Sequence, residues 1–144
     1  MDFKYNTASV QDIALHLYDG EFAYIQHLMA RVNIDQYANK IKSFAHCFEA
    51  WNNAHLIGLV AVYLNIEEKR GYITNVTVLP GWHSCGIASR LLQACINYVD
   101  DAGVKEIGLE VNTKSIRAQK LYLKHGFIYT DETADSFKMV RIAL

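Results

Sequence analysis

The sequence predicts an α/β (α+β) fold, that is, one mixed sheet of six to seven strands with helices on both faces. Three observations support this. Strand-like segments are followed by a helix and then by further strands, an order typical of a mixed sheet. Residues 56–64 are almost wholly apolar, as a central strand covered on both faces should be. An apolar strand ending at Leu79 also leads through a short polar loop into the strongest helical pattern of the chain.

The first half of the chain is predicted to be mainly helical between its strands. Ser9 is expected to cap a helix that ends at Asp19 and Gly20. Asn52 and Asn53 are expected to form a turn between two strands. The segments expected to be strands are residues 3–6, 46–51 and 56–64, and those expected to be helices are residues 10–18, 22–32 and 36–44.

The second half alternates strands and helices. The helix over residues 86–101 has an apolar stripe formed by Ala88, Leu92, Cys95, Ile96 and Val99. Ser115 is expected to cap a second helix that Gly126 ends, with Ala118, Leu121, Tyr122 and His125 on its buried side. The remaining strands are expected at residues 71–79, 105–111, 127–130 and 137–143, the last two as a hairpin.

Composition limits the class of protein. The chain has 144 residues, is 51% hydrophobic and carries a formal net charge of −1, so we expect one globular domain, residues 1–144, and no nucleic-acid partner. Its three cysteines and six histidines lack metal-ligand spacing, so no metal is expected. No signal peptide and no apolar run of membrane-spanning length is present, which predicts a cytoplasmic protein without a membrane partner. A homodimer is left open.

The loop between the strand ending at Leu79 and the following helix is suited to binding an anion. The first N–H groups of a helix have no intrahelical partner, and the helix dipole adds partial positive charge there. Gly86 and Ala88 let a phosphate approach the backbone closely. The pattern contains neither G-x-x-x-x-G-K-[ST] nor G-x-G-x-x-G, which excludes two common nucleotide-binding loops.

This loop, V-x-P-x-x-H-x-x-G-x-A, resembles the acetyl-CoA signature of the GNAT N-acetyltransferase superfamily, [RQ]-x-x-G-x-[GA] after a V-x-P strand end. His83 stands where Arg or Gln is usual, Ser84 replaces a frequent Gly, and Cys85 stands where Lys or Arg often helps to hold the phosphates. Residues 109–127 resemble a second GNAT motif, L-x-V-x-x-x-N-x-x-A-x-x-L-Y-x-K-x-G-F, with Ser115 in place of Asn. The second half is similar to ribosomal-protein alanine N-acetyltransferases.

The resemblance implies the GNAT acyl-CoA N-acyltransferase fold and acetyl-CoA as cosubstrate. Backbone groups of Val76 and Val78 would hold the pantetheine arm where their strand splays from the next parallel strand, and the N–H groups of residues 84–89 would hold the pyrophosphate. His83 would either contact a phosphate or cap the loop. The full set of expected cosubstrate-binding residues is Val76, Thr77, Val78, His83, Ser84, Cys85, Gly86, Ile87, Ala88, Ser89, Ser115 and Ala118.

Two residues are predicted to be catalytic. Tyr122 occupies the family's general-acid position, and a phenol can protonate the leaving thiolate when its pKa lies above the working pH. Glu110 lies twelve residues before Tyr122, as does the proposed base of ribosomal-protein alanine N-acetyltransferases, and it faces away from Leu109 and Val111. The alternatives are a water relay as the base and a solvated or Lys-paired Glu110. Cys85 as a nucleophile is disfavoured, because family members transfer the acyl group directly.

The resemblance implies that the helical segment of residues 19–37 and the last hairpin wall the acceptor site. This wall offers carboxylates and aromatic rings that suit a cationic amine, namely Asp19, Glu21, Phe22, Tyr24, Asp35 and Tyr37. We expect direct acetyl transfer to a primary amine of a small molecule, such as an amino sugar, amine, amino acid or antibiotic. The alternatives are a protein N-terminus or lysine as acceptor, and a non-catalytic module that binds acyl-CoA.

Overall fold

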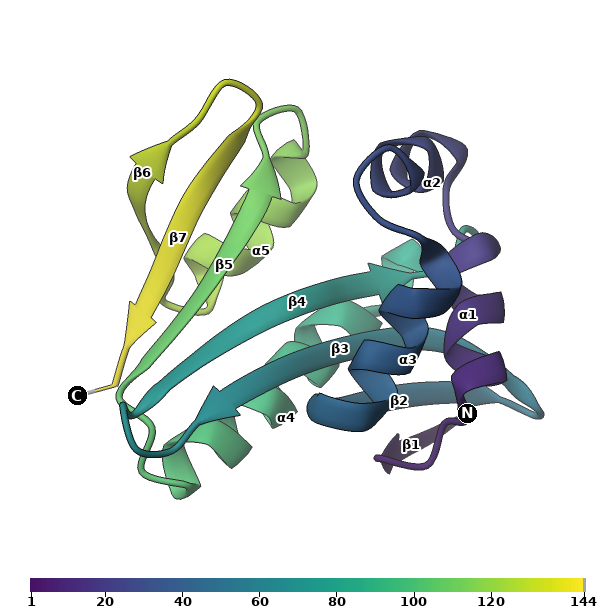
Figure 1. The fold of residues 1–144 in the computed structure, drawn as a ribbon, viewed down its shortest axis with the longest axis horizontal. Coiled ribbons are helices and arrows are strands. Elements are labelled where there is room, and N and C mark those ends of the chain that lie inside the picture. Colours follow the sequence, from purple (N-terminus) through teal and green to yellow (C-terminus); the bar gives the residue numbers. More distant parts are fainter. Residues whose placement is uncertain (144) are drawn as a thin grey trace.

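The computed structural model describes residues 1–143 and leaves out the side chains of residues 22 and 23. Within residues 1–143 the chain forms a seven-stranded mixed sheet with helices on both of its faces (Figure 1). The elements are β1 (Asp2–Tyr5), α1 (Val10–Tyr18), α2 (Phe22–Met29), α3 (Ile34–Phe44), β2 (His46–Asn52), β3 (His55–Asn65), β4 (Arg70–Val78), the 3₁₀ turn η1 (His83–Cys85), α4 (Ile87–Asp101), β5 (Glu106–Asn112), α5 (Ile116–Lys124), β6 (Ile128–Glu132) and β7 (Ser136–Ile142). The predicted fold class is confirmed.

The sheet opens between its two parallel strands. Its order is β1-β2-β3-β4-β5-β7-β6, and β4 and β5 are parallel neighbours whereas the other described pairs are antiparallel. They pair only at their beginnings, from Arg70 opposite Glu106 to Tyr72 opposite Gly108. Beyond this point the two strands diverge, as Figure 1 shows. The carboxyl ends of β4 and β5 therefore bound an opening, and beyond Tyr72 and Gly108 the two facing strand edges are not paired with each other.

Strand β3 separates two hydrophobic cores. Val60 and Val62 point into the core under α4 and α5, whereas Leu59 and Ala61 point into the core under α1, α2 and α3. All four side chains are fully buried, because successive residues of a strand face opposite sides of the sheet. The near-continuous apolar run of residues 56–64 is explained by this double coverage, as predicted.

A buried carboxylate attaches the start of α1 to the sheet. Glu49 on β2 is fully buried and accepts hydrogen bonds from the backbone N–H groups of Thr7 (3.0 Å) and Ala8 (3.1 Å). It also accepts from the Thr7 hydroxyl (2.6 Å) and from the Trp51 indole N–H (3.0 Å). These four donors satisfy the buried carboxyl group. The following helix α1 begins with a capping box between Ser9 and Asp12, as its sequence predicts.

Three predictions about helices need correction. Helix α2 ends at Met29 rather than near residue 32, and α3 begins two residues earlier than predicted, because Asn33 caps it by accepting from Gln36 N–H (3.0 Å). Ser115 does occupy the N-cap position of α5, but its side chain makes no capping hydrogen bond, since its ψ of 70° is far from the extended value of a capping residue.

The buried side of α5 also differs from its predicted stripe. Its fully buried residues are Gln119 and Tyr122, whereas Ala118, Leu121 and His125 are half-buried. Gln119 can be buried because its amide donates to the carbonyls of Asn112 (3.2 Å) and Thr113 (3.1 Å) and accepts from the Tyr129 hydroxyl (2.8 Å). A polar residue therefore fixes α5 to the end of β5.

Candidate active site

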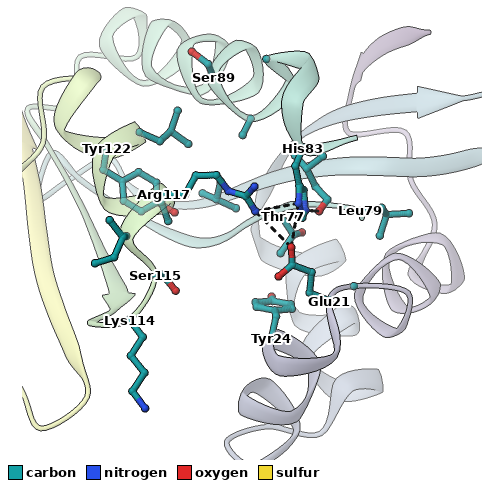
Figure 2. A pocket seen from close by; sticks show the side chains of 18 of the residues that line it. Glu21, Tyr24, Thr77, Leu79, His83, Ser89, Lys114, Ser115, Arg117 and Tyr122 are labelled. Atoms are coloured by element: carbon teal, nitrogen blue, oxygen red, sulfur yellow. Dashed lines mark hydrogen bonds and ion pairs between the residues drawn. The ribbon is translucent and has the colours of Figure 1, made fainter. Parts of the chain in front are cut away.

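A cavity of about 660 Å³ lies at the opening between β4 and β5. Figure 2 shows Tyr122 on its α5 side, Glu21 and Tyr24 on its α2 side, and His83 at the 3₁₀ turn. The cavity is lined by His16, Gly20, Glu21, Tyr24, Val76, Thr77, Val78, Leu79, His83, Gly86, Ala88, Ser89, Lys114, Ser115, Ile116, Arg117, Ala118, Leu121 and Tyr122. Segments more than a hundred residues apart thus meet around it.

The N-terminus of α4 faces this cavity. Gly86 separates η1 from α4 and has a φ of 72°, a left-handed conformation that most residues with a side chain avoid. In the described part of the chain no side chain caps α4. The N–H groups of its first turn are therefore available to an anion, as the loop pattern predicts.

A second glycine brings α4 close to the sheet. A Cβ atom on Gly58 of β3 would lie 2.9 Å from Cγ2 of Ile87 and 3.1 Å from Cδ1 of Leu91. Because real Cβ atoms do not tolerate contacts this short, only glycine permits the first turns of α4 to pack directly on β3. Gly58 is also the register partner of Val78, so this contact sets the helix N-terminus beside the end of β4.

The structure brings most of the predicted cosubstrate-binding residues together. Those that line the cavity are Val76, Thr77, Val78, His83, Gly86, Ala88, Ser89, Ser115 and Ala118. Ser84, Cys85 and Ile87 do not line it. Ile87 is buried under Gly58 instead, and the Cys85 N–H donates to the carbonyl of Trp82 (3.3 Å).

Three charged or polar side chains meet across the cavity. His83 Nδ1 lies 3.0 Å from Glu21 Oε1 and 3.0 Å from Arg117 Nη2, and Arg117 Nη2 lies 3.5 Å from Glu21 Oε1 (Figure 2). The other ring nitrogen of His83 donates to the carbonyl of Val78 (2.8 Å). Since a carbonyl can only accept, this contact places a proton on Nε2. His83 therefore fixes the loop to the end of β4, as the loop-capping alternative expects, and because it also lines the cavity its contact with a phosphate stays a prediction.

Tyr122 joins the buried core to the cavity. Only 6% of the residue is exposed, and its ring packs at 5.9 Å from that of Phe127. Burial raises the pKa of Tyr122 above its ordinary value, because the phenolate would lose its hydration. Tyr122 therefore keeps its proton at neutral pH, which a general acid requires.

Glu110 lines a different, smaller cavity. This space of about 150 Å³ lies between α2, the end of β5 and the β6–β7 turn, and it is lined by His27, Arg31, Glu110, Val111, Asn112, Thr133, Asp135 and Ser136. Glu110 is exposed and lies opposite Lys138 in the β5–β7 register, whereas its neighbours Leu109 and Val111 are buried. Tyr72 is the last β4 residue paired with β5, and the charges of Glu110 and Arg31 from the smaller cavity act on it. Burial raises the pKa of Tyr72, the nearby Glu110 charge raises it further, and Arg31 lowers it.

A chain of hydrogen bonds runs from α1 through β4 to α2. His16 is 2% exposed, and its Nδ1 and Nε2 atoms lie 2.8 Å from the Leu56 carbonyl and 2.6 Å from Thr77 Oγ1. Thr77 Oγ1 lies 2.7 Å from Asn75 Oδ1, and Asn75 Nδ2 lies 2.8 Å from the Tyr24 hydroxyl. His16, Thr77 and Tyr24 all line the larger cavity. These contacts connect a buried histidine to a tyrosine at the site.

Some residues at the site were not predicted as functional. Arg117 at the start of α5 and Lys114 just before this helix bring positive charge to the cavity, and neither is a fixed position of the motif that contains Ala118 and Tyr122. His16 belongs to no motif of the sequence. Its position on the α1 face of Ile13 and Leu17 could have indicated a buried polar role.

The predicted acceptor wall is only partly at the site. Glu21 and Tyr24 line the larger cavity, whereas Asp19, Asp35 and Tyr37 line neither of the two cavities described above. Tyr37 instead donates to the carbonyl of Thr74 (2.6 Å). The side chain of Phe22 lies outside the described residues. Gly20, His27 and Arg31 of the same segment also line one of the cavities, as do Thr133, Asp135 and Ser136 of the last hairpin, and their contact with an acceptor stays a prediction.

Within residues 1–143, no group of three or more His, Cys, Asp and Glu side chains is placed to hold a metal ion. Over the same described range, no helix combines the length and the apolar character that crossing a membrane requires.

Within the described residues, the opened parallel pair has a helix N-terminus without a side-chain cap at its mouth. The chain belongs to the acetyltransferase (GNAT) family, whose family model matches residues 10–127. It is 28% identical over 90 residues to the uncharacterized N-acetyltransferase YedL of Escherichia coli. This match covers 61% of this chain and 56% of that protein. The chain spans about half the length of the curated relatives that it matches.

Solved structures show the same fold. The ribosomal-protein-S18-alanine N-acetyltransferase from Escherichia coli matches with a TM-score of 0.80 and 15% identity, covering 99% of this chain and 96% of that one. The PaiA N-acetyltransferase from Thermoplasma acidophilum, solved in complex with coenzyme A, matches with a TM-score of 0.75 and 15% identity, covering 99% and 100%. The resemblance to GNAT proteins read from the sequence is confirmed.

Proposed function

We propose that this protein transfers the acetyl group of acetyl-CoA directly to a primary amine of a small molecule. The observation that carries the proposal is the cavity itself, where the α4 N-terminus, the free edge of β4 and Tyr122 converge. The CoA complex of PaiA, which shares the fold, supports the choice of cosubstrate. Residues 1–144 would act as a single domain, because both cores share β2 and β3.

The residues present fit coenzyme A. Its pyrophosphate would lie at the first turn of α4, where N–H groups and the helix dipole favour an anion. Arg117 and Lys114 supply the positive charge that the loop itself lacks at Cys85. The pantetheine arm would lie along Val76 and Val78 of β4. The pairing of β4 with β5 ends at Tyr72, before these two residues. The amide groups of the arm would then pair with the strand edge.

Tyr122 lines the larger cavity and Glu110 the smaller one, and we assign the two catalytic roles to them. The amine nitrogen attacks the thioester carbonyl, the amine loses a proton, and the thiolate leaves. Tyr122 would give its proton to the departing sulfur, because it lines the cavity and its hydroxyl is protonated at neutral pH. Glu110 would take the amine proton, directly or through water, from the smaller cavity next to the opening.

The smaller cavity supports a small acceptor. At about 150 Å³ it is a small space, which suits a compact amine. Glu110 and Asp135 would attract an ammonium group, and Arg31 would attract an anionic substituent such as a carboxylate. The similarity in fold to a ribosomal-protein alanine N-acetyltransferase keeps a protein N-terminus as the second candidate acceptor.

A thiol-release assay with acetyl-CoA tests the proposal. The panel should contain small amines, amino sugars, amino acids, and peptides with a free N-terminus or an internal lysine. Amine-dependent release of CoA with a small amine is expected. Release with peptides alone would contradict the small-molecule assignment. CoA binding without release for any amine would indicate a non-catalytic acyl-CoA-binding module. Light scattering on the same preparation tests for a homodimer, and cell fractionation tests the cytoplasmic location.

A further inference from the structure

In each hydrogen bond between His16 and Tyr24 one partner donates and the other accepts. The protonation of His16 decides which partner donates. The Leu56 carbonyl can only accept, so its contact with His16 places a proton on Nδ1. Thr77 has a single hydroxyl proton. If Thr77 donates that proton to Asn75, the short contact between Thr77 and His16 needs a second imidazole proton on Nε2. That arrangement therefore requires a positively charged His16.

The surroundings of His16 disfavour that charge. His16 is 2% exposed, and burial lowers its pKa to about 4, although the Leu56 carbonyl and the Asp19 charge oppose the shift. From β4 it contacts a neutral group, the Thr77 hydroxyl. The cavity's carboxylate, Glu21, lies against His83 and Arg117 instead. His16 is therefore neutral at neutral pH.

A neutral His16 reverses every hydrogen bond of the chain. Nε2 then accepts the Thr77 proton, and the Thr77 oxygen accepts in turn from the amide NH₂ of Asn75. This requires the Asn75 amide to exchange its oxygen and nitrogen positions, which are nearly identical in shape. The Asn75 oxygen then accepts the proton of the Tyr24 hydroxyl. Since that proton is committed, Tyr24 can offer a ligand only a lone pair.

We propose that His16 is a positioning residue that, through Thr77 and Asn75, turns the Tyr24 hydroxyl into a hydrogen-bond acceptor for an N–H of the amine acceptor. This inference rests on the proposed function. An ammonium or amine nitrogen presents N–H donors, so a hydroxyl held as an acceptor attracts it, whereas a hydroxyl free to donate competes with it. Tyr24 lies on the α2 side of the cavity, across from Tyr122 (Figure 2). His16 and Asn75, which are both buried, would thereby help to fix the orientation of the amine acceptor.

Nitrogen NMR of the histidine rings tests the direction of the chain without requiring activity. In ¹⁵N-labelled protein at pH 7, His16 should show a protonated Nδ1 and an unprotonated Nε2, with the signals assigned by their loss in His16→Gln. A doubly protonated ring, or a proton on Nε2 alone, would overturn the proposal. If His16 shows the expected protonation but the protein acetylates no amine in the thiol-release assay, the proposed function is refuted. The role of Tyr24 in amine binding is then refuted as well.

Steady-state kinetics with the best amine of the panel test whether this chain of hydrogen bonds contributes to amine binding. Thr77→Val removes the central hydroxyl at nearly constant volume, and Tyr24→Phe removes the terminal one. Each should raise the KM for the amine roughly threefold to tenfold, as expected for one lost hydrogen bond. Thermal protection by CoA should be unchanged, because the pantetheine arm is assigned to the backbone of β4, which Thr77→Val keeps. Thr77→Ser keeps the hydroxyl and should restore the parent KM.

Two comparisons separate this role from a general structural one. Thr74→Val makes the same change three residues earlier on β4, where the hydroxyl contacts Tyr37 and lines neither cavity, so the KM should stay at the parent value. The double variant Thr77→Val/Tyr24→Phe should be no worse than Tyr24→Phe alone, because Thr77 acts through Tyr24. Additive effects, an unchanged KM in Thr77→Val, or an equal rise in Thr74→Val would each overturn the proposal.

Discussion

His83 Nδ1 and Glu21 Oε1 lie 3.0 Å apart, which joins the loop before α4 to the residue before α2. Arg117 of α5 reaches the same two side chains, at 3.0 Å from His83 and 3.5 Å from Glu21. The three residues therefore bridge the cavity that would receive CoA. A bound pyrophosphate would compete with Glu21 for Arg117, because both are anions next to one guanidinium.

Arg117→Gln is expected to weaken CoA binding about threefold to tenfold, since it removes one charge-assisted contact with phosphate. The parent's affinity should also fall more steeply with added salt than the variant's, because salt screens exposed charges. Isothermal titration with CoA at two salt concentrations measures both effects. Lys120→Gln removes an exposed cation of α5 that does not line the cavity and serves as the control. Equal losses in both variants would assign the effect to net charge alone.

Gly86→Asn should abolish most of the thermal protection that CoA gives, because a side chain would enter the space in front of the α4 N-terminus. Nothing lies within 4 Å of a Cβ at this position, and Asn tolerates the positive φ of 72° better than most residues. Gly103→Asn is the matched control, with a φ of 77° and equally open surroundings at the other end of α4. If CoA raises the melting temperature of both variants as much as that of the parent, the pyrophosphate does not bind at Gly86.

Tyr122→Phe should lower turnover by about a hundredfold or more while leaving CoA affinity almost unchanged, because it removes the proton donor and keeps the ring that packs on Phe127. Steady-state kinetics and CoA titration measure the two quantities. Tyr98→Phe, a change at an exposed tyrosine of α4 away from the cavity, should have parental turnover. A folded Tyr122→Phe protein with parental turnover would remove Tyr122 from the mechanism.

Glu110→Gln should reduce the rate most at low pH and progressively less as the pH approaches the pKa of the amine. At low pH little amine is unprotonated and a base must remove its proton, whereas at high pH the solvent has already done so. A pH–rate profile of parent and variant measures this convergence. Glu106→Gln, at the other end of β5 and 3.9 Å from Arg70, is the matched control and should follow the parent. Parallel profiles for parent and Glu110→Gln would make water or another residue the base.

Gly58→Ala is expected to lower the free energy of unfolding by about 1–3 kcal/mol, because its Cβ would lie 2.9 Å from Ile87 and displace the start of α4. CoA protection should fall with it, since the displaced turn would hold the pyrophosphate. Gly108→Ala on β5 is the control, because the nearest atom to its Cβ would be Cδ1 of Tyr72 at 3.9 Å. Chemical denaturation of the two variants should differ clearly. Equal stabilities would mean that α4 can shift without cost.

Local patterns were enough to predict the order of the elements and the character of the loop. The apolar run of residues 56–64 indicated a strand buried on both faces, and the loop with Gly86 and Ala88 indicated an anion-binding helix start. Such features depend on residues close in the chain, namely alternation, helical spacing, capping side chains and glycine, so the sequence alone determines them. The helix ends near Met29 and Ser115 were less predictable, because capping there depends on backbone angles that the pattern does not set.

Only the tertiary structure decided which side chains meet. Arg117 and Glu21 are 96 residues apart, and His16 and Thr77 are 61 apart, so no spacing in the sequence relates them. The divergence of β4 and β5 places Glu110 in a smaller cavity than Tyr122, although both belong to one motif. Burial then fixes the proton positions, because a histidine deprived of water stays neutral and its neighbours must donate to it. The sequence alone therefore determined the family and its loop, whereas long-range packing decided the electrostatics of the site.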